Sequence, residues 1–242
     1  MQLLAGTSGY SYKEWLGRFY PEKLPAAEML HFYAERFATV EINNTFYRMP
    51  AESMLEQWTH QVPPRFRFTL KAPRRITHDK RLREAESNVT EFLRRASVLG
   101  EQLGVVLFQL PPYLKKDIPR LSDFLALLPP GTRAAFEFRN DSWHDDDVYA
   151  TLRGRSAMLC VTDTDEGETP FVATSDCGYV RLRRTHYDDD DLRAWTTRIA
   201  DAALPLTYVY FMHEDEALGT RFALRLNELW AVRDTPPPGG RQ

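Results

Sequence analysis

Short apolar runs alternate with stretches of helical spacing along almost the whole chain. The runs are rich in Val, Phe, Tyr and Leu, whereas most stretches between them repeat apolar residues every three or four positions. This alternation predicts β-strands separated by α-helices. The predicted strands are Leu3–Gly6, Thr39–Ile42, Arg67–Lys71, Val105–Gln109, Arg133–Phe138, Ala157–Val161, Gly178–Leu182 and Leu206–Phe211.

Most of the connections have the length and the spacing of helices. The connection from Thr162 to Cys177 does not, so the helix after the sixth strand is expected to be degenerate. The acidic runs Asp145–Asp147 and Asp188–Asp191 stand where two helices should begin, a position that the helix dipole favours. The predicted helices are Ala26–Phe37, Ala51–His60, Glu84–Gly100, Pro119–Leu128, Asp145–Arg153, Asp189–Ala203 and Ala217–Val232.

This order of elements over 242 residues indicates the α/β class. We expect a (β/α)8 TIM barrel of eight parallel strands, and a doubly wound open sheet is the competing arrangement. No change in composition marks a second domain. The sequence therefore predicts one barrel domain over residues 1–235 and a disordered tail over residues 236–242, which read PPPGGRQ.

Polar side chains occupy every second position near the ends of several strands. Val40 and Ile42 share one face, which leaves Glu41 on the other, and Phe136 and Phe138 do the same for Glu137. The C-terminal ends of the strands form the active face of a TIM barrel, so these side chains should meet at one mouth. The further candidates at strand ends are Lys71, Gln109, Arg139, Asp163, Arg181 and Tyr210.

Two interpretations of the carboxylates follow. Glu41 and Glu137 are candidate catalytic acid and base, with Lys71, Arg139 and Arg181 binding charge. Alternatively, the same residues form an internal ion-pair network that stabilises the barrel without catalysing a reaction.

Loops next to the predicted mouth add candidates for substrate binding. Gly6–Gly9, which includes Ser8, could bind an oxyanion through its amides and hydroxyls, although a tight turn also explains the glycines. The basic loop Lys71–Arg83 suggests an anionic substrate, and a solvated loop is the simpler explanation. Asn43 follows the second strand. Aromatic walls for a ring or sugar could come from Phe46, Tyr47, Tyr113, Trp143 and Tyr210, although core packing is the default for each.

Composition limits the partners. A net charge of -3 gives no global attraction to nucleic acid or anionic membranes, and no apolar run is long enough to cross a bilayer. The N-terminal residues lack the pattern of a signal peptide, so we expect a cytoplasmic protein with no membrane partner. Cys160 and Cys177 are expected to be buried free thiols. We expect no metal and no other cofactor, because the histidines are scattered over loops.

Several motifs in chain order carry a resemblance to a known family. GTSGYSYKEW, KAPRRITHDKRL, QLPPYL and EFRNDSW, together with the strands, resemble the DUF72 or YecE-like family of TIM-barrel proteins from about Leu3 to Trp230. The resemblance implies a TIM barrel with a polar mouth and no established biochemical activity. The matching positions are Gly6, Thr7, Ser8, Gly9, Glu41, Asn43, Thr45, Phe46, Tyr47, Lys71, Gln109, Pro111, Pro112, Glu137, Arg139, Ser142, Trp143, Tyr179 and Arg181.

Two short segments depart from the family pattern. Arg183 and Arg184 replace a His-Gly pair after the seventh strand, and Met212-His213-Glu214 replaces Asn-Asn-Asp after the eighth. The leading hypothesis is a metal-independent enzyme acting on a small anionic or sugar-like molecule. The alternatives are nucleic-acid phosphodiester processing, by analogy with endonuclease-IV-like barrels, and a non-catalytic ligand-binding barrel.

Overall fold

Eight parallel strands form a nearly closed barrel in the computed structural model, which describes residues 1–212 and 215–233. Their order around the barrel is β1-β9-β8-β6-β5-β4-β3-β2, and a two-residue strand, β7, pairs antiparallel with β6 outside this ring. The strands are β1 (Gln2–Thr7), β2 (Thr39–Ile42), β3 (Arg67–Lys71), β4 (Leu103–Gln109), β5 (Ala134–Glu137), β6 (Met158–Thr164), β7 (Gly167–Glu168), β8 (Cys177–Leu182) and β9 (Leu206–Phe211).

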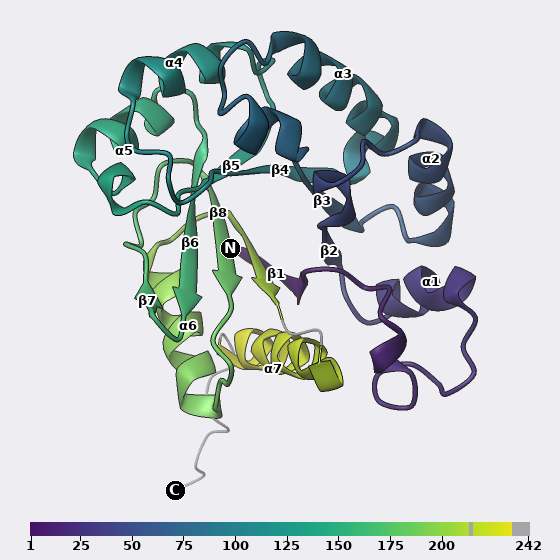
Figure 1. Cartoon of the computed structure of the whole chain (residues 1–242). Coiled ribbons are helices and arrows are strands. Elements are labelled where there is room, and N and C mark those ends of the chain that lie inside the picture. Colours follow the sequence, from purple (N-terminus) through teal and green to yellow (C-terminus); the bar gives the residue numbers. More distant parts are fainter. Residues whose placement is uncertain (213–214, 234–242) are drawn as a thin grey trace, which may run out of the picture.

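Helices lie around the outside of the strands (Figure 1). Several begin with the acidic caps that the sequence predicts. Asp145 caps α5, and Asp188 caps α6 in a capping box with Asp191. The helices are α1 (Met29–Ala34), α2 (Glu52–Gln61), α3 (Glu86–Ala96), α4 (Ile118–Ala126), α5 (Asp146–Arg153), α6 (Asp189–Asp201) and α7 (Leu218–Arg233).

The seam between β1 and β2 closes the barrel with little direct strand pairing. A single bridge links Ser8 to Glu41, and the Gly9 amide donates to the Glu41 carbonyl over 2.7 Å. The hydroxyl of Tyr33, from α1, accepts from the β1 amide of Thr7 at 2.9 Å and donates to the β2 carbonyl of Thr39 at 3.1 Å. Tyr33 therefore supplies hydrogen bonds that a full ladder would otherwise make.

Glycine is required at the seam by the close approach of the two strands. A Cβ on Gly6 would lie 2.3 Å from the carbonyl oxygen of Thr39. No side chain fits in that space, so Gly6 lets β1 approach β2 closely enough for the hydrogen bonds of Thr7 and Gly9 to form.

The core has two parts, which follow the alternation of side chains along the strands. Phe136 stacks on Phe108 at 5.2 Å, and both contact Phe124 of α4, so they belong to the layer between strands and helices. The barrel interior holds a second apolar cluster made of Leu4, Val105, Leu107, Ala135, Met158, Cys160, Cys177, Tyr179, Tyr208 and Tyr210. Side chains along β5 therefore alternate between the two parts. The aromatic side chains point outward to the helices, and the side chains between them point into the barrel.

The fold predicted from the sequence is confirmed, including the missing helix after the sixth strand. The chain between β6 and β8 instead turns back as β7. Cys160 and Cys177 are free and buried, as expected. No helix of residues 1–212 and 215–233 combines the length and the hydropathy of a membrane span. The predicted tail, 236–242, lies outside the described residues.

Candidate active site

Three charged side chains meet inside the C-terminal mouth of the barrel. Arg181 of β8 donates from Nη2 to Oε1 of Glu41 over 2.8 Å and from Nη1 to Oε2 of Glu137. Arg181, Glu41 and Glu137 are only 1%, 0% and 2% exposed. We call these three residues the mouth cluster. A single guanidinium thus bridges carboxylates from β2 and β5, on opposite parts of the ring.

Neutral donors satisfy further oxygens of the carboxylates. Ser8 Oγ donates to Glu41 Oε1 over 2.6 Å, and the Tyr179 hydroxyl donates to Glu41 Oε2. Burial, followed by the charge of Glu41, raises the pKa of Tyr179, which keeps its hydroxyl a donor. Gln109 Nε2 donates to Glu137 Oε1 over 2.9 Å. The carboxylates are therefore held in fixed positions by strands β1, β4 and β8.

Two arginines extend the cluster toward solvent. Arg139 Nε lies 3.1 Å from Glu137 Oε1, and Arg183 Nη1 lies 3.6 Å from the same oxygen. Burial alone would raise the pKa of Glu137, but Arg181, Arg139 and Arg183 outweigh it and hold that pKa well below its usual range. Glu137 is therefore ionised at neutral pH.

Lys71 adds a fourth cation at the end of β3. Its Nζ lies 4.3 Å from the centre of the Phe46 ring, and the His78 ring meets the Phe46 ring edge to face, with the ring centres 4.9 Å apart. Burial, followed by the charge of Arg181, lowers the pKa of Lys71 to about 8. Burial and the charge of Lys71 also lower the pKa of His78.

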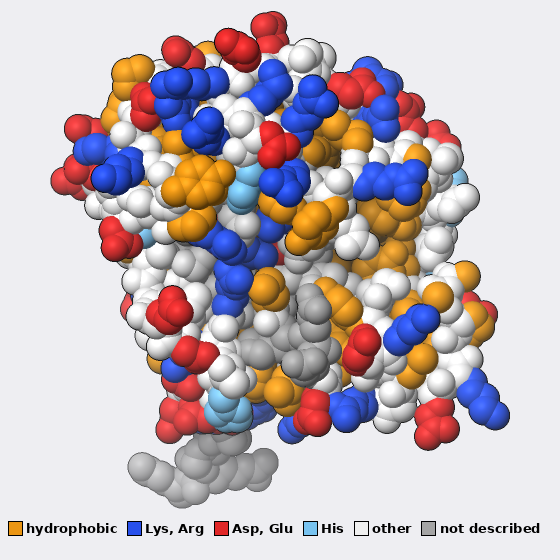
Figure 2. Space-filling model, in the orientation of Figure 1, with side chains coloured by type: hydrophobic (Ala, Val, Ile, Leu, Met, Phe, Trp, Pro, Cys, Tyr) orange, Lys and Arg blue, Asp and Glu red, His pale blue; other side chains and the backbone are white. Residues whose placement is uncertain are grey.

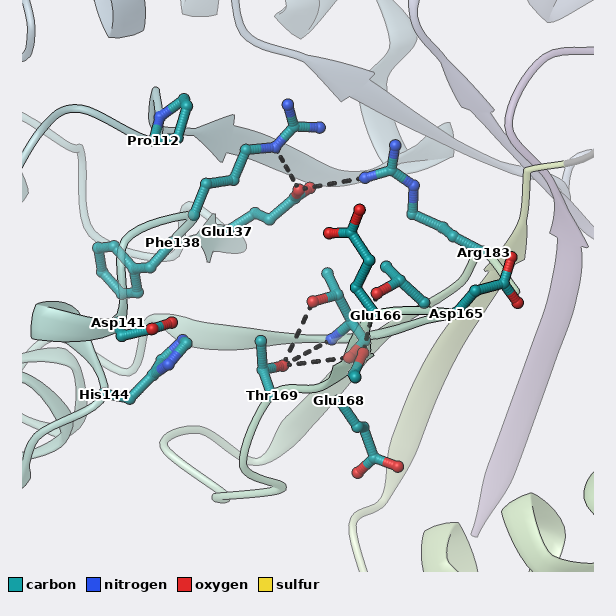
Figure 3. Close-up of a pocket in the computed structure, with 14 residues that line it drawn as sticks. Pro112, Glu137, Phe138, Asp141, His144, Asp165, Glu166, Glu168, Thr169 and Arg183 are labelled. Atoms are coloured by element: carbon teal, nitrogen blue, oxygen red, sulfur yellow. Dashed lines mark hydrogen bonds and ion pairs between the residues drawn. The ribbon is translucent and has the colours of Figure 1, made fainter. Parts of the chain in front are cut away.

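An open pocket of about 800 Å³ extends from Glu137 across the loops after β5, β6 and β8. Arg139 and Arg183 line it next to Glu137. Glu166 of the β6–β7 turn and Thr169, which follows β7, form another wall (Figure 3). In the orientation of Figure 1, Lys and Arg side chains gather near the middle of the face (Figure 2). Lys71, at the end of β3, is not part of the lining. The pocket thus opens toward one side of the mouth.

The structure brings together most of the side chains that the sequence assigned to the mouth. Glu41, Glu137 and Arg181 form its centre, as the alternating faces require. Ser8, Gln109 and Arg139 contact the two carboxylates directly. Lys71 lies near enough to Arg181 for the arginine charge to lower the pKa of the lysine.

Four predicted residues lie elsewhere. Asp163 Oδ2 accepts from Arg184 Nε at 3.0 Å and from Trp195 Nε1 of α6 at 3.2 Å, so Asp163 belongs to the helix layer. Trp143 is buried and stacks on Phe138 at 4.7 Å. The aromatic side chains of Tyr47 and Tyr210 also lie outside the mouth cluster. Tyr47 is 78% exposed, and the Tyr210 hydroxyl bonds to the threonines of β2 and β3 within the barrel interior.

Asn43 has an unused acceptor next to the mouth. It follows β2 two positions after Glu41, and its buried Oδ1 has no hydrogen-bond partner among the described residues. A ligand donor would satisfy this oxygen. The sequence assignment of Asn43 to substrate binding therefore stays a proposal.

Two contributors had no clear signal in the sequence. Arg183 stood out only as a departure from the family pattern, yet it follows Arg181 by two positions and so shares its face of the strand. Phe46 was one of several aromatic residues with no distinguishing signal. Of the other departures, Met212 places Sδ 3.8 Å from Arg181 Nη2, and residues 213–214 lie outside the described residues.

Residues 1–212 and 215–233 contain no group of three or more His, Cys, Asp or Glu that could hold a metal ion. The site is instead made of arginine, lysine, carboxylate and amide groups. Its chemical capacities are the binding of anions, the donation of hydrogen bonds and proton transfer through Lys71.

The fold and the mouth cluster define a TIM barrel whose polar site lies at the C-terminal face. The chain belongs to the family described as "Protein of unknown function DUF72", whose model matches residues 4–241. Its curated relatives include the UPF0759 protein YecE of Escherichia coli K12, 37% identical over 112 residues, which are 46% of this chain and 41% of YecE. The UPF0759 protein YunF of Bacillus subtilis is 28% identical over 138 residues, 54% of this chain and 49% of YunF. Each alignment thus spans less than half of the relative.

Solved structures share the fold over nearly the whole chain. A DUF72 family protein from Thermotoga maritima matches with a TM-score of 0.84 and 26% identity, covering 96% of this chain and 100% of that one. A DUF72 family protein from Enterococcus faecalis matches with a TM-score of 0.78 and 17% identity, covering 99% and 100%, which shows the fold alone.

Proposed function

We propose that the chain is a metal-independent enzyme that acts on a small anionic or sugar-like molecule at the mouth of the barrel. One observation carries the proposal: around Arg181, four cationic groups face the two buried carboxylates. Glu41 and Glu137 balance two of the charges of Arg181, Arg139, Arg183 and Lys71, which leaves an excess of two positive charges when Lys71 is protonated. An anionic ligand at the mouth cluster would balance this excess, which does not extend over the rest of the pocket, because Asp141, Asp165, Glu166 and Glu168 line it there.

The depth of each side chain suggests its role. Arg139 and Arg183 are 35% and 21% exposed, so they can contact a ligand directly, whereas Arg181 is buried behind them. Glu137 is ionised and cannot donate a proton at neutral pH. Both carboxylates hold Arg181 and are shielded from solvent, so we assign Glu41 and Glu137 the positioning of the arginines, in place of the acid and base roles expected from the sequence. Preorganised cations of this kind stabilise negative charge that develops in a transition state.

The arrangement of the cations favours a small molecule over nucleic acid. A nucleic-acid backbone presents phosphates along an extended path, which favours cations spread over a groove or a face. Here Lys71, Arg139, Arg181 and Arg183 converge on one mouth. This convergence fits one or two anionic groups of a small ligand.

Anion binding is the first test. Titration calorimetry should detect binding of inorganic phosphate or of a small sugar phosphate to the full chain. Arg139→Gln and Arg183→Gln should each raise the Kd by about tenfold or more, because each removes a charged hydrogen-bond donor. Arg193→Gln, on the exposed face of α6, is the matched control and should leave the Kd unchanged.

Turnover is the second test. Phosphorylated sugars and small carboxylic acids incubated with the protein should include at least one compound whose NMR spectrum changes with time, and the change should slow in Arg183→Gln. If no anion binds, or if all three variants bind equally well, the proposal is wrong. Binding without any turnover would support a ligand-binding barrel instead.

A further inference from the structure

We propose that Lys71 is a catalytic residue that forms a Schiff base with a small anionic aldehyde or ketone bound at the mouth. The inference rests on the proposed function and narrows its substrate class to carbonyl compounds that carry a carboxylate or phosphate group. The main observation is that the amine of Lys71 lies near arginines that can bind an anion.

The first observation is the placement of the amine. Lys71 is the last residue of β3, so it stands at the end of the barrel where the mouth cluster lies. Its Nζ lies over the Phe46 ring at 4.3 Å. Within residues 1–212 and 215–233, no carboxylate lies within ion-pair distance of this amine. Contact with an aromatic face leaves the amine able to lose its proton and react as a nucleophile. A direct salt bridge would instead stabilise the protonated ammonium.

The second observation is the charge around Lys71. Arg181 from β8, Arg139 after β5 and His78 from the turn at Arg75–Asp79 face it, and these groups oppose a further positive charge when they are protonated. Glu41 and Glu137 attract the ammonium, but both are already engaged by Arg181. Burial and Arg181 therefore prevail, and the pKa of about 8 leaves roughly a quarter of the amine neutral at pH 7.5.

The third observation is the neighbouring anion-binding groups. Arg139 and Arg183 are half-buried, and each lies next to Glu137. Lys71 lies outside the pocket lining but within range of the charges of Arg181 and Arg139. A small molecule whose carboxylate or phosphate is held by Arg139 would therefore have to extend across the mouth to bring its carbonyl group to Lys71. This placement raises the local concentration of the carbonyl group at the amine.

The chemistry balances without an oxidant, a reductant or a metal. The neutral Nζ attacks the carbonyl carbon, a C–N bond forms, and the carbonyl oxygen takes up a proton to give a carbinolamine. Loss of that oxygen as water, with the second proton of the nitrogen, leaves a C=N bond. Once this imine takes up one proton from solvent, it attracts electrons from the adjacent carbon and so activates bonds there.

Trapping by reduction tests the inference. The full chain is incubated with glyoxylate or pyruvate at pH 7.5 and treated with sodium borohydride, and the adduct is located by peptide mass spectrometry. We expect modification at Lys71 to exceed that at exposed lysines such as Lys23 by about tenfold or more, because an ordinary lysine has a pKa near 10.4. Propanal, which carries no anionic group, should label Lys71 less than glyoxylate does.

Two variants separate the possible outcomes. Lys71→Arg keeps the positive charge but removes the primary amine, so it should abolish selective trapping while phosphate binding persists. Lys23→Arg is the matched control and should leave trapping unchanged. If glyoxylate labels all lysines equally, or if none is labelled, the Schiff base is refuted. Phosphate binding is measured in the same preparation. If phosphate still binds, only the Schiff base is wrong; if it does not, the proposed anion site is wrong as well.

Discussion

Arg181 and Glu41 form an ion pair with an Nη2 to Oε1 distance of 2.8 Å, and both side chains are almost completely shielded from solvent. Such a pair must recover a large cost of desolvation, which it does only with further hydrogen bonds. Here Ser8, Tyr179 and the second carboxylate, Glu137, supply them. The pair is consequently sensitive to the removal of any one partner.

The first prediction concerns Arg181. Arg181→Met removes the charge that neutralises two buried carboxylates, and it should lower the free energy of unfolding by about 3–5 kcal/mol. Urea denaturation at pH 7 measures the loss. Arg193→Met on α6 is the control and should change stability by less than about 0.5 kcal/mol, since its ion pairs are exposed. A loss below about 1 kcal/mol for Arg181→Met would mean that the cluster relaxes or takes up water.

The second prediction concerns Glu137 and pH. The pKa of Glu137 is lower in the folded chain than in the unfolded chain, where it is about 4.3. Its stabilising contribution is therefore complete above that value and is lost as the pH falls below it. Glu137→Gln should destabilise the protein by about 3 kcal/mol at pH 7.

The pH dependence distinguishes the ion pair from a packing effect. The difference in unfolding free energy between wild type and Glu137→Gln should shrink steadily as the pH is lowered from 5 to about 3. Urea titrations at several pH values measure this difference. A difference that stays constant over the range would contradict the low pKa of Glu137.

The third prediction concerns Lys71. Its lowered pKa destabilises the folded chain, whereas the lowered pKa of Glu137 stabilises it. A lysine whose pKa is lowered on folding costs stability while it is charged, and that cost is relieved as the pH rises from about 8 toward its unfolded value near 10.4. Lys71→Met should therefore raise the melting temperature at pH 7. The advantage should narrow between pH 8 and about 10. An unchanged or lower melting temperature at pH 7 would indicate that the ammonium is well accommodated.

The fourth prediction concerns the seam. Gly6→Ala places a methyl group where only 2.3 Å separates it from the Thr39 carbonyl oxygen, so β1 and β2 must move apart. We expect a loss of about 2 kcal/mol or more in unfolding free energy. Gly154→Ala is the matched control, because its Cβ would meet nothing nearer than 3.6 Å and its backbone is helical. Comparable losses in both variants would refute the steric explanation.

The sequence was sufficient for the fold and for the centre of the site. Alternation along β2 and β5 placed Glu41 and Glu137 on the interior face, because each is flanked by apolar residues that need the helix layer. The parallel arrangement then brought the C-terminal strand ends together. These inferences depend only on local periodicity and on the closure of the barrel.

Asp163 lies outside the mouth, in contrast to the expectation from the sequence. The same alternation places Thr162 toward the pocket, so Asp163 must face outward, where Arg184 and Trp195 bind it. A carboxylate near the end of a strand is a reasonable candidate for the mouth, but the alternation along the strand decides which way it faces. Trp143 was misjudged for a different reason: its stacking on Phe138 depends on the path of a loop, which no periodicity in the sequence specifies.

Glu41 belongs both to the seam and to the mouth cluster, since its carbonyl oxygen accepts from the Gly9 amide while its carboxylate holds Arg181. The Gly9 amide hydrogen can exchange with solvent only when this hydrogen bond opens. A bound anion would relieve the repulsion among the mouth cations and keep the seam shut. The exchange rate of one backbone amide thereby reports whether the site is occupied, without any assay of the reaction.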